Sequence, residues 1–214
     1  MSLTQDLAIL NKANREKIPG EALEIMDRAT EELKEKHLAE RSLKVGDQFP
    51  EANLIDANKN TVNVASLYAE TPLVVLFYRG GWCPYCNMEL RAFQQHLEEI
   101  KSEGARLVAI TPETPDNSLT TAEKNELEFE VLSDIDNRFA KSLGLVFSLP
   151  ESLKQIYEQF GIDLKKHHQN TDFELPMPAT FIIDKGGSVR YSFIDEDYTK
   201  RADPAEVITA LKNM

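Results

Sequence analysis

The two cysteines of this chain stand three positions apart, in the segment Trp82-Cys83-Pro84-Tyr85-Cys86. Two thiols at this spacing share the first turn of a helix and can close a short disulfide. The reactive form is the thiolate, and the unpaired amides at a helix N-terminus favour it. A thiolate attacks peroxides and disulfides. The spacing therefore predicts redox chemistry, with Cys83 and Cys86 as catalytic residues and as a redox disulfide.

The neighbours of the pair suit that chemistry. Gly80 and Gly81 allow a sharp turn and the close approach of a partner molecule. Trp82 is expected to cover one side of the site. Arg79 has two interpretations: a cation that favours the thiolate and polarises a peroxide, or a surface residue paired with an acidic neighbour.

A metal site is the competing use for a cysteine pair. A structural zinc ion takes four ligands, mostly Cys and His. The chain has no third cysteine, and His167 and His168 are adjacent in a segment expected to be a polar loop. We therefore expect no metal and no cofactor. A protein stabilised by disulfides has more cysteines at wider spacings than these two. The cysteine usage is therefore that of a protein in a reducing compartment.

Strands and helices must position the pair, and the hydrophobic pattern alternates between them. The uninterrupted apolar run 73–78 is typical of a strand buried on both faces, and a helical pattern starts near Asn87. This alternation predicts an α/β fold with a central mixed sheet flanked by helices and an N-terminal β-hairpin. Further strands are expected at 53–56, 61–64, 106–111, 129–132, 180–184 and 188–193, and further helices near 118–127, 137–143, 151–160 and 204–212.

The chain is expected to divide into a helical N-terminal extension, 1–42, and one domain, 43–214, with an insertion at about 145–176. Within the extension, one helical stripe holds five residues at steps of three and four: Leu23, Met26, Thr30, Leu33 and His37. The stripe can dock on its own domain or form a seam with a second subunit. The sequence leaves both open, and with them a homodimer.

Composition and charge limit the classes of partner that the chain is expected to bind. The net charge of −12, without a basic stripe, argues against nucleic acid. The longest apolar run has the length of a strand, so we expect no membrane partner. The first residues lack the basic start and apolar stretch of a secretory signal. Together with the cysteine usage, this predicts a cytoplasmic protein.

The segment FYRGGWCPYCNMEL resembles the stretch FYPxxxTPxCTxEL of the alkyl hydroperoxide reductase/thiol-specific antioxidant family of peroxiredoxins, without a gap. The run VGDQFPEANLIDANKNTVNVASLY resembles the opening hairpin of that family, and the resemblance extends over about 43–213. It implies a thioredoxin-like fold. In this register, Cys86 takes the place of the peroxidatic cysteine, and Glu89-Leu90 matches the Glu-Leu of the family.

The departures from the family pattern concern the site. The proline of the family is Arg79 here, its threonine is Cys83, and its second arginine would fall at 177–179. There the chain reads Met-Pro-Ala, which resembles the cis-proline loop of thioredoxins and implies that Pro178 lies beside the reactive sulfur. Glu89 is expected to stabilise or cap the start of its helix.

A replacement for the missing guanidinium is not evident in the sequence. Arg190 and Arg201 could in principle supply it, but both are expected to face solvent.

Two mechanisms follow from the resemblance. In a peroxidase, Cys86 attacks hydrogen peroxide or an organic hydroperoxide and becomes a sulfenic acid, which Cys83 resolves as a disulfide. In a thioredoxin-like disulfide reductase, Cys83 attacks the substrate and Cys86 releases the mixed disulfide. Both need an external thiol such as thioredoxin or glutathione. We favour the peroxidase, because the overall resemblance is to peroxiredoxins.

A third hypothesis is a redox-inactive binding protein with a thioredoxin fold. The loss of the family's proline and threonine supports it. The retained cysteine pair argues against it.

Overall fold

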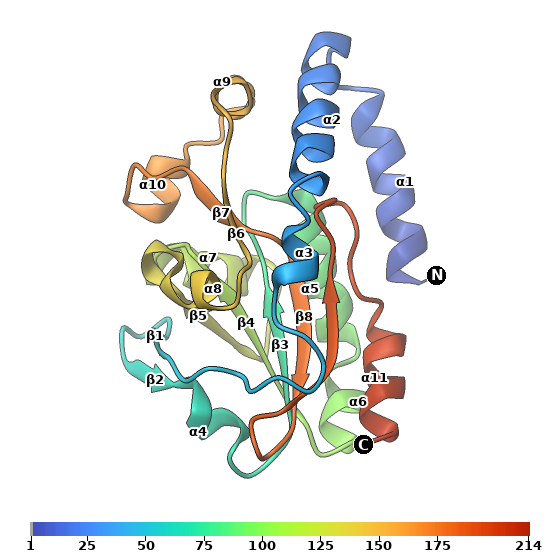
Figure 1. Ribbon diagram of the computed structural model, residues 1–214, viewed down its shortest axis with the longest axis vertical. Coiled ribbons are helices and arrows are strands. Elements are labelled where there is room, and N and C mark those ends of the chain that lie inside the picture. Colours follow the sequence, from blue (N-terminus) through green and yellow to red (C-terminus); the bar gives the residue numbers. More distant parts are fainter. Residues whose placement is uncertain (1) are drawn as a thin grey trace.

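The structure is a computed structural model, and it describes residues 2–214. Figure 1 shows a central sheet with helices on both of its faces and a helical hairpin at one end. The helices are α1 (Leu3–Arg15), α2 (Gly20–Lys34), α3 (Leu38–Arg41), α4 (Val64–Tyr68), α5 (Pro84–Gln95), α6 (Leu97–Ser102), α7 (Pro115–Lys124), α8 (Arg138–Ser142), α9 (Glu151–Gln159), α10 (Leu164–His168) and α11 (Pro204–Lys212), with a 3₁₀ turn η1 (Ile135–Asn137).

Seven strands form the central sheet in the order β2-β1-β5-β4-β3-β8-β9. The inner strands β3, β4 and β5 are parallel, while the β1–β2 hairpin and the β8–β9 hairpin add antiparallel strands. The predicted mixed sheet is thus confirmed. The strands are β1 (Asn53–Ile55), β2 (Thr61–Asn63), β3 (Leu73–Phe77), β4 (Arg106–Thr111), β5 (Glu130–Ser133), β8 (Ala179–Ile183) and β9 (Val189–Ile194).

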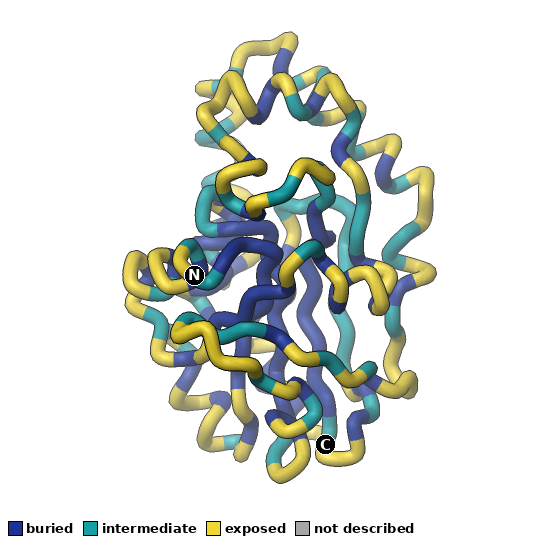
Figure 2. The backbone as a smooth tube through the Cα atoms, turned by 90° about the vertical axis from the view of Figure 1, so that its left-hand side faces the viewer, coloured by how far each residue is buried: buried dark blue, intermediate teal, exposed yellow. Residues whose placement is uncertain are grey.

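Strand β3 is buried along its whole length, as its apolar run predicts. Side chains alternate between the faces of a strand, so its residues divide between two cores. Val74 and Leu76 join the core under α5, α6 and α11, whereas Val75 and Phe77 join the core on the side of α4 and α8. Figure 2 shows the buried backbone gathered in the centre of the molecule. A strand held from both sides is a rigid base for the loop that follows it.

The N-terminal helices pack within the chain. Helix α1 lies against α5 and buries Leu3 and Leu7, while α2 lies against α9. Two residues of the predicted stripe pack within the chain: Met26 lies against the cluster that includes α9, and Leu33 is buried. His37 is not part of the stripe, because α2 ends at Lys34 and His37 adopts a left-handed backbone conformation.

The segment 145–176 contains more structure than the sequence predicts. Its helix α9 was expected, but the polar loop predicted around His167 and His168 is helix α10. Strands β6 (Val146–Ser148) and β7 (Glu174–Pro176) pair at its base as a separate small sheet. This ladder holds α9 close to the end of β3. Among residues 2–214, no helix is long and apolar enough to cross a membrane.

Candidate active site

The cysteine pair lies where β3 passes into α5. Cys83 is the N-cap residue of α5, Pro84 opens the helix and Cys86 stands in its first turn. Proline is favoured at this position because its missing amide hydrogen would have no partner there. Both cysteines are free thiols, and both are buried. The predicted placement at a helix N-terminus is confirmed.

The loop before the pair has no room for side chains at its two glycines. Gly80 has a φ of +154°, and a Cβ there would lie 2.3 Å from Nε1 of Trp82. A Cβ on Gly81 would lie 2.1 Å from Oγ1 of Thr121. The Gly81 amide donates to Oε2 of the buried Glu113 at 2.8 Å. The loop is thereby fixed both sterically and by a hydrogen bond.

Cys86 lies beside a buried ion pair that the sequence does not predict. Nε of Arg201 is 2.7 Å from Oε2 of Glu89, and Nη2 of the same guanidinium is 3.4 Å from Sγ of Cys86. The expectation that Arg201 faces solvent is wrong, because its side chain is 1% exposed. Arg190 does reach the surface, as expected. Arg201 reaches the site from the loop before α11, so the missing guanidinium is supplied from a distant part of the chain.

Glu89 is therefore more than a helix cap. Burial raises its pKa to about 8, and the charge of Arg201 opposes that rise. Its Oε1 atom has no hydrogen-bond partner among the described residues. The carboxyl group thus holds Arg201 beside Cys86 at the energetic cost of its own burial.

Arg79 is buried as well, which excludes the surface interpretation. Its guanidinium carbon lies 4.5 Å from the ring centre of Tyr198 and 4.9 Å from that of Trp82. Nη2 donates a hydrogen bond to the hydroxyl oxygen of Tyr157, which comes from α9. Aromatic faces attract cations without neutralising them. Arg79 thus retains its positive charge beside the thiol pair.

The two sulfurs differ in their electrostatics. Burial acts to raise the pKa of Cys83, but a hydrogen bond from the Cys86 thiol and the charges of Arg79 and Arg201 lower it to about 6. Burial raises the pKa of Cys86, and its neighbour Cys83 adds to the rise. The pKa of Cys83 is therefore the lower of the two and that of Cys86 the higher.

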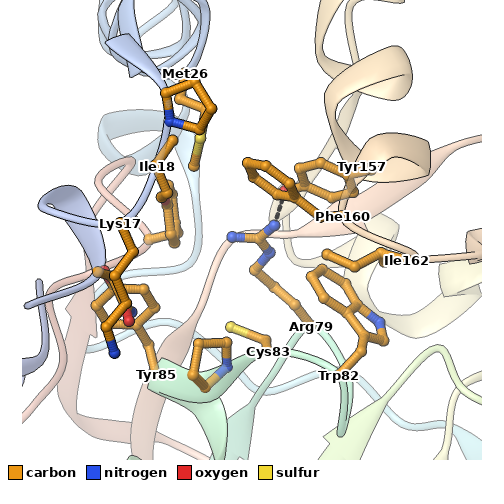
Figure 3. Close-up of a pocket in the computed structure, with 14 residues that line it drawn as sticks. Lys17, Ile18, Met26, Arg79, Trp82, Cys83, Tyr85, Tyr157, Phe160 and Ile162 are labelled. Atoms are coloured by element: carbon orange, nitrogen blue, oxygen red, sulfur yellow. Dashed lines mark hydrogen bonds between the residues drawn. The ribbon is translucent and has the colours of Figure 1, made fainter. Parts of the chain in front are cut away.

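A pocket of about 350 Å³ opens beside Cys83. Figure 3 shows the Cys83 sulfur at the base, the Arg79 guanidinium extending between the two sides toward Tyr157, and Trp82 on one wall. Cys86 is not among the lining residues, although the two cysteines are buried to nearly the same extent. The pocket therefore gives a small molecule a route to Cys83 first.

Pro178 does not form the expected cis-proline loop. None of the peptide bonds described for residues 2–214 is cis, so that expectation is wrong. Pro178 is buried between β7 and β8 and lines a small cavity together with Arg79 and Tyr157. Residues 2–214 contain no cluster of three or more His, Cys, Asp or Glu side chains that could hold a metal ion.

The fold and the thiol pair define a thioredoxin-fold redox protein, and comparisons with known proteins narrow the class. Residues 45–192 match the sequence model of the AhpC/TSA family, so the chain belongs to this family. It is 27% identical to peroxiredoxin Bcp of Escherichia coli, over 72% of this chain and 86% of that protein. It is 29% identical to the chloroplastic peroxiredoxin Q of Populus jackii, over 68% of this chain and 57% of that protein.

Solved structures agree with the fold. Peroxidoxin BcpB of Mycobacterium tuberculosis superimposes with a TM-score of 0.63 at 19% identity, over 80% of this chain and 98% of that one. A peroxiredoxin-like protein of Aquifex aeolicus gives 0.64 at 21% identity, over 80% and 88%. The relatives are peroxiredoxins, and the chain is accordingly a thiol-dependent peroxidase. The disulfide-reductase and binding-protein alternatives are not favoured.

Proposed function

We propose that this protein reduces peroxides with the Cys83–Cys86 pair, and that Cys83 is the first sulfur to react. The Cys83 thiolate attacks one peroxide oxygen, the O–O bond breaks, and the leaving oxygen takes a proton to form water or an alcohol. Cys83 is then a sulfenic acid. The Cys86 thiol attacks it, water leaves, and a disulfide joins the two residues.

The order in which the two sulfurs react is inferred from their access to the pocket. Cys83 borders the pocket and has the lowered pKa, whereas Cys86 lies beneath it. The family register instead places Cys86 at the peroxidatic position. The contact of Arg201 with Cys86 is compatible with either order, because the same guanidinium also lowers the pKa of Cys83. Both sulfurs are buried, but only Cys83 borders the pocket, so a peroxide that enters the pocket meets Cys83 before Cys86.

The remaining residues have supporting roles in this proposal. Arg79 favours the thiolate, and its charge is placed to polarise the peroxide, with Trp82 and Tyr157 holding the guanidinium from the sides. Arg201 keeps the resolving thiol in place, and Glu89 positions Arg201. Pro178 packs behind this cluster.

The oxidised pair must be returned to two thiols by an external reductant. We propose a small thiol or a dithiol protein such as glutathione or thioredoxin, acting in the cytoplasm, where such reductants keep thiols reduced. Each turnover then transfers two electrons from that reductant to the peroxide.

The test follows the thiols through one turnover. The reduced protein is mixed with one equivalent of hydrogen peroxide, and its free thiols and intact mass are measured. We expect both thiols to disappear, with the loss of two hydrogen atoms and a single intramolecular disulfide. Dithiothreitol should restore both and sustain peroxide consumption. Unchanged thiols, together with no consumption above the rate of free cysteine, would contradict the proposal.

A further inference from the structure

The walls of the pocket beside Cys83 come from parts of the chain that are far apart in sequence. The turn between α1 and α2 contributes Ile18, and α2 itself contributes Met26. The end of α9 and the residues after it contribute Phe160 and Ile162, which face the N-terminal hairpin across the cavity in Figure 3. The loop that carries the cysteines makes the base of the pocket and, through Trp82, part of one wall.

The N-terminal wall lies outside the part of the chain that matches the family, residues 45–192. It is nevertheless held firmly. Leu3 and Leu7 are buried against α5, and Arg15 makes two hydrogen bonds of 2.7 and 2.8 Å with Asp27 across the α1–α2 hairpin. The hairpin is therefore a fixed component of the pocket.

The chemistry of these walls is apolar and aromatic. Lys17 and Arg79 are the charged residues that line the pocket, and no carboxylate does so, although the chain carries a net charge of −12. Phe160 is 41% exposed at the rim, which extends the apolar surface outward. Hydrogen peroxide is small and polar, so it would make little use of such walls. A larger apolar molecule would lose water-exposed surface against them.

We infer that the N-terminal hairpin is a specificity element, and that with the 160–162 segment it selects bulky apolar organic hydroperoxides over hydrogen peroxide. The inference rests on the proposed peroxidase function. The organic group lies between Ile18 and Phe160 while the peroxide group meets Cys83. The thiolate attacks the terminal oxygen, the O–O bond breaks, and the alcohol leaves after it has taken a proton. Burial of the organic group favours binding before and during the attack.

The kinetic test compares cumene hydroperoxide with hydrogen peroxide, with dithiothreitol as reductant. The wild-type protein should have the higher kcat/KM for cumene hydroperoxide. In Ile18→Ala and, separately, Phe160→Ala, the ratio of the two kcat/KM values should fall about tenfold, the scale on which pocket methylenes discriminate substrates. The matched control is Ile9→Ala, whose side chain is 57% exposed on α1 and should leave the ratio unchanged.

The outcomes separate the two proposals. Turnover of both peroxides with the same ratio in the wild type and in both pocket variants overturns the specificity role alone. A wild-type preference for hydrogen peroxide does the same. Failure to consume either peroxide contradicts the peroxidase function, and this inference with it.

A binding measurement tests the pocket without turnover. Trp82 is the single tryptophan of the chain and lines the pocket, so its fluorescence reports occupancy. The probe is 2-phenyl-2-propanol, the alcohol that cumene hydroperoxide would yield. We expect a saturable change in the fluorescence of the wild-type protein and of Ile9→Ala, with binding about tenfold weaker in Ile18→Ala. Equal binding by all three proteins, or none by the wild type, would overturn the inference.

Discussion

The two sulfurs differ because different groups surround each of them. Cys83 lies at the pocket and near two buried guanidinium groups, so its pKa falls to about 6 in spite of burial. Cys86 lies deeper, next to the other sulfur, and its pKa rises. Two identical side chains thereby obtain different pKa values from the positions that the helix start gives them.

The first prediction concerns pH. Because the pKa of Cys83 is lowered, its thiolate is present above pH 6 and is lost as the pH falls below that value. The second-order rate constant for peroxide should therefore rise from pH 5 to 7 and then level off. Arg79→Gln should move the midpoint upward, since the charge that favours the thiolate is gone, whereas the exposed Arg190→Gln should not. Stopped-flow Trp82 fluorescence provides the rates. A wild-type midpoint near 9 would refute the assignment.

The second prediction concerns the buried ion pair. Loss of one partner leaves the other without compensation, so Arg201→Gln should lower the free energy of unfolding by about 3–5 kcal/mol. Without Arg201, the pKa of Glu89 should rise above about 8. Below about pH 8 the folded carboxyl is protonated in both proteins, so their stabilities fall in parallel, whereas above about pH 8 only the wild-type protein holds it ionised beside Arg201. The loss should therefore be larger at pH 9, where the full value applies, than at pH 6.

Urea denaturation at the two pH values measures this loss. The control is Lys101→Gln, which removes an exposed pair with Glu98 and should change stability by no more than about 1 kcal/mol. If the free energy of unfolding falls equally in Arg201→Gln and in the control, the buried ion pair stabilises the fold no more than an exposed pair does.

At the scale of elements, the loop between β3 and α5 decides where the sulfurs lie. It leaves a strand that is buried on both faces, turns at Gly80 and Gly81, and is tied to Glu113 through an amide hydrogen bond. Glu113 is in turn 2.7 Å from Nδ1 of His167 on α10. The loop is thus braced by α10, an element in which the sequence predicts only a polar loop.

The third prediction concerns a second contact of this loop, the close packing of Gly81 against Thr121 on α7, and tests it by a clash and its relief. Gly81→Ala places a Cβ against Oγ1 of Thr121, which must displace the loop or α7. Overpacking of this kind costs about 1–3 kcal/mol, and peroxide consumption should slow at least tenfold as Cys83 moves. Thr121→Ala removes the opposing oxygen, so the double variant should recover most of both losses. Additive effects in the double variant would contradict the steric explanation.

A further element, α1, anchors the hairpin that forms one wall of the pocket. The fourth prediction is that Leu7→Ala lowers the free energy of unfolding by about 2–5 kcal/mol, because Leu7 is 4% exposed in the core against α5. Ile9→Ala on the opposite face is the matched control and should be nearly neutral. Denaturation curves for the two variants that coincide would show that α1 is only loosely attached.

At the scale of the whole molecule, sequence patterns predicted those features that depend on residues close together in the chain. The apolar run of β3, the hairpins and the cysteines at a helix start are all written in neighbouring residues, so the fold class and the thiol pair could be predicted. Arg201 could not be, because it meets Cys86 across 115 residues of sequence and belongs to no short motif. The same holds for Tyr157, whose role depends on how the β6–β7 ladder places α9.

Two segments outside the cysteine loop build the pocket together. The segment 2–41 and the segment 145–176 pack on each other through α2 and α9, and both contribute to the pocket over one end of the sheet. A thioredoxin-like sheet and helix α5 provide the reactive pair, and these two segments form walls of the pocket beside it. Neither segment carries the chemistry itself.

Sulfenic acid trapping in the two single-cysteine variants tests the central claim most directly. Each reduced variant is treated with hydrogen peroxide in the presence of dimedone, and the labelled residue is identified by peptide mass spectrometry. Cys86→Ser should accumulate dimedone on Cys83 at the rate of wild-type peroxide consumption, whereas Cys83→Ser should label Cys86 slowly or not at all. Rapid labelling of Cys86 in Cys83→Ser, with Cys83 unlabelled in Cys86→Ser, would contradict the account.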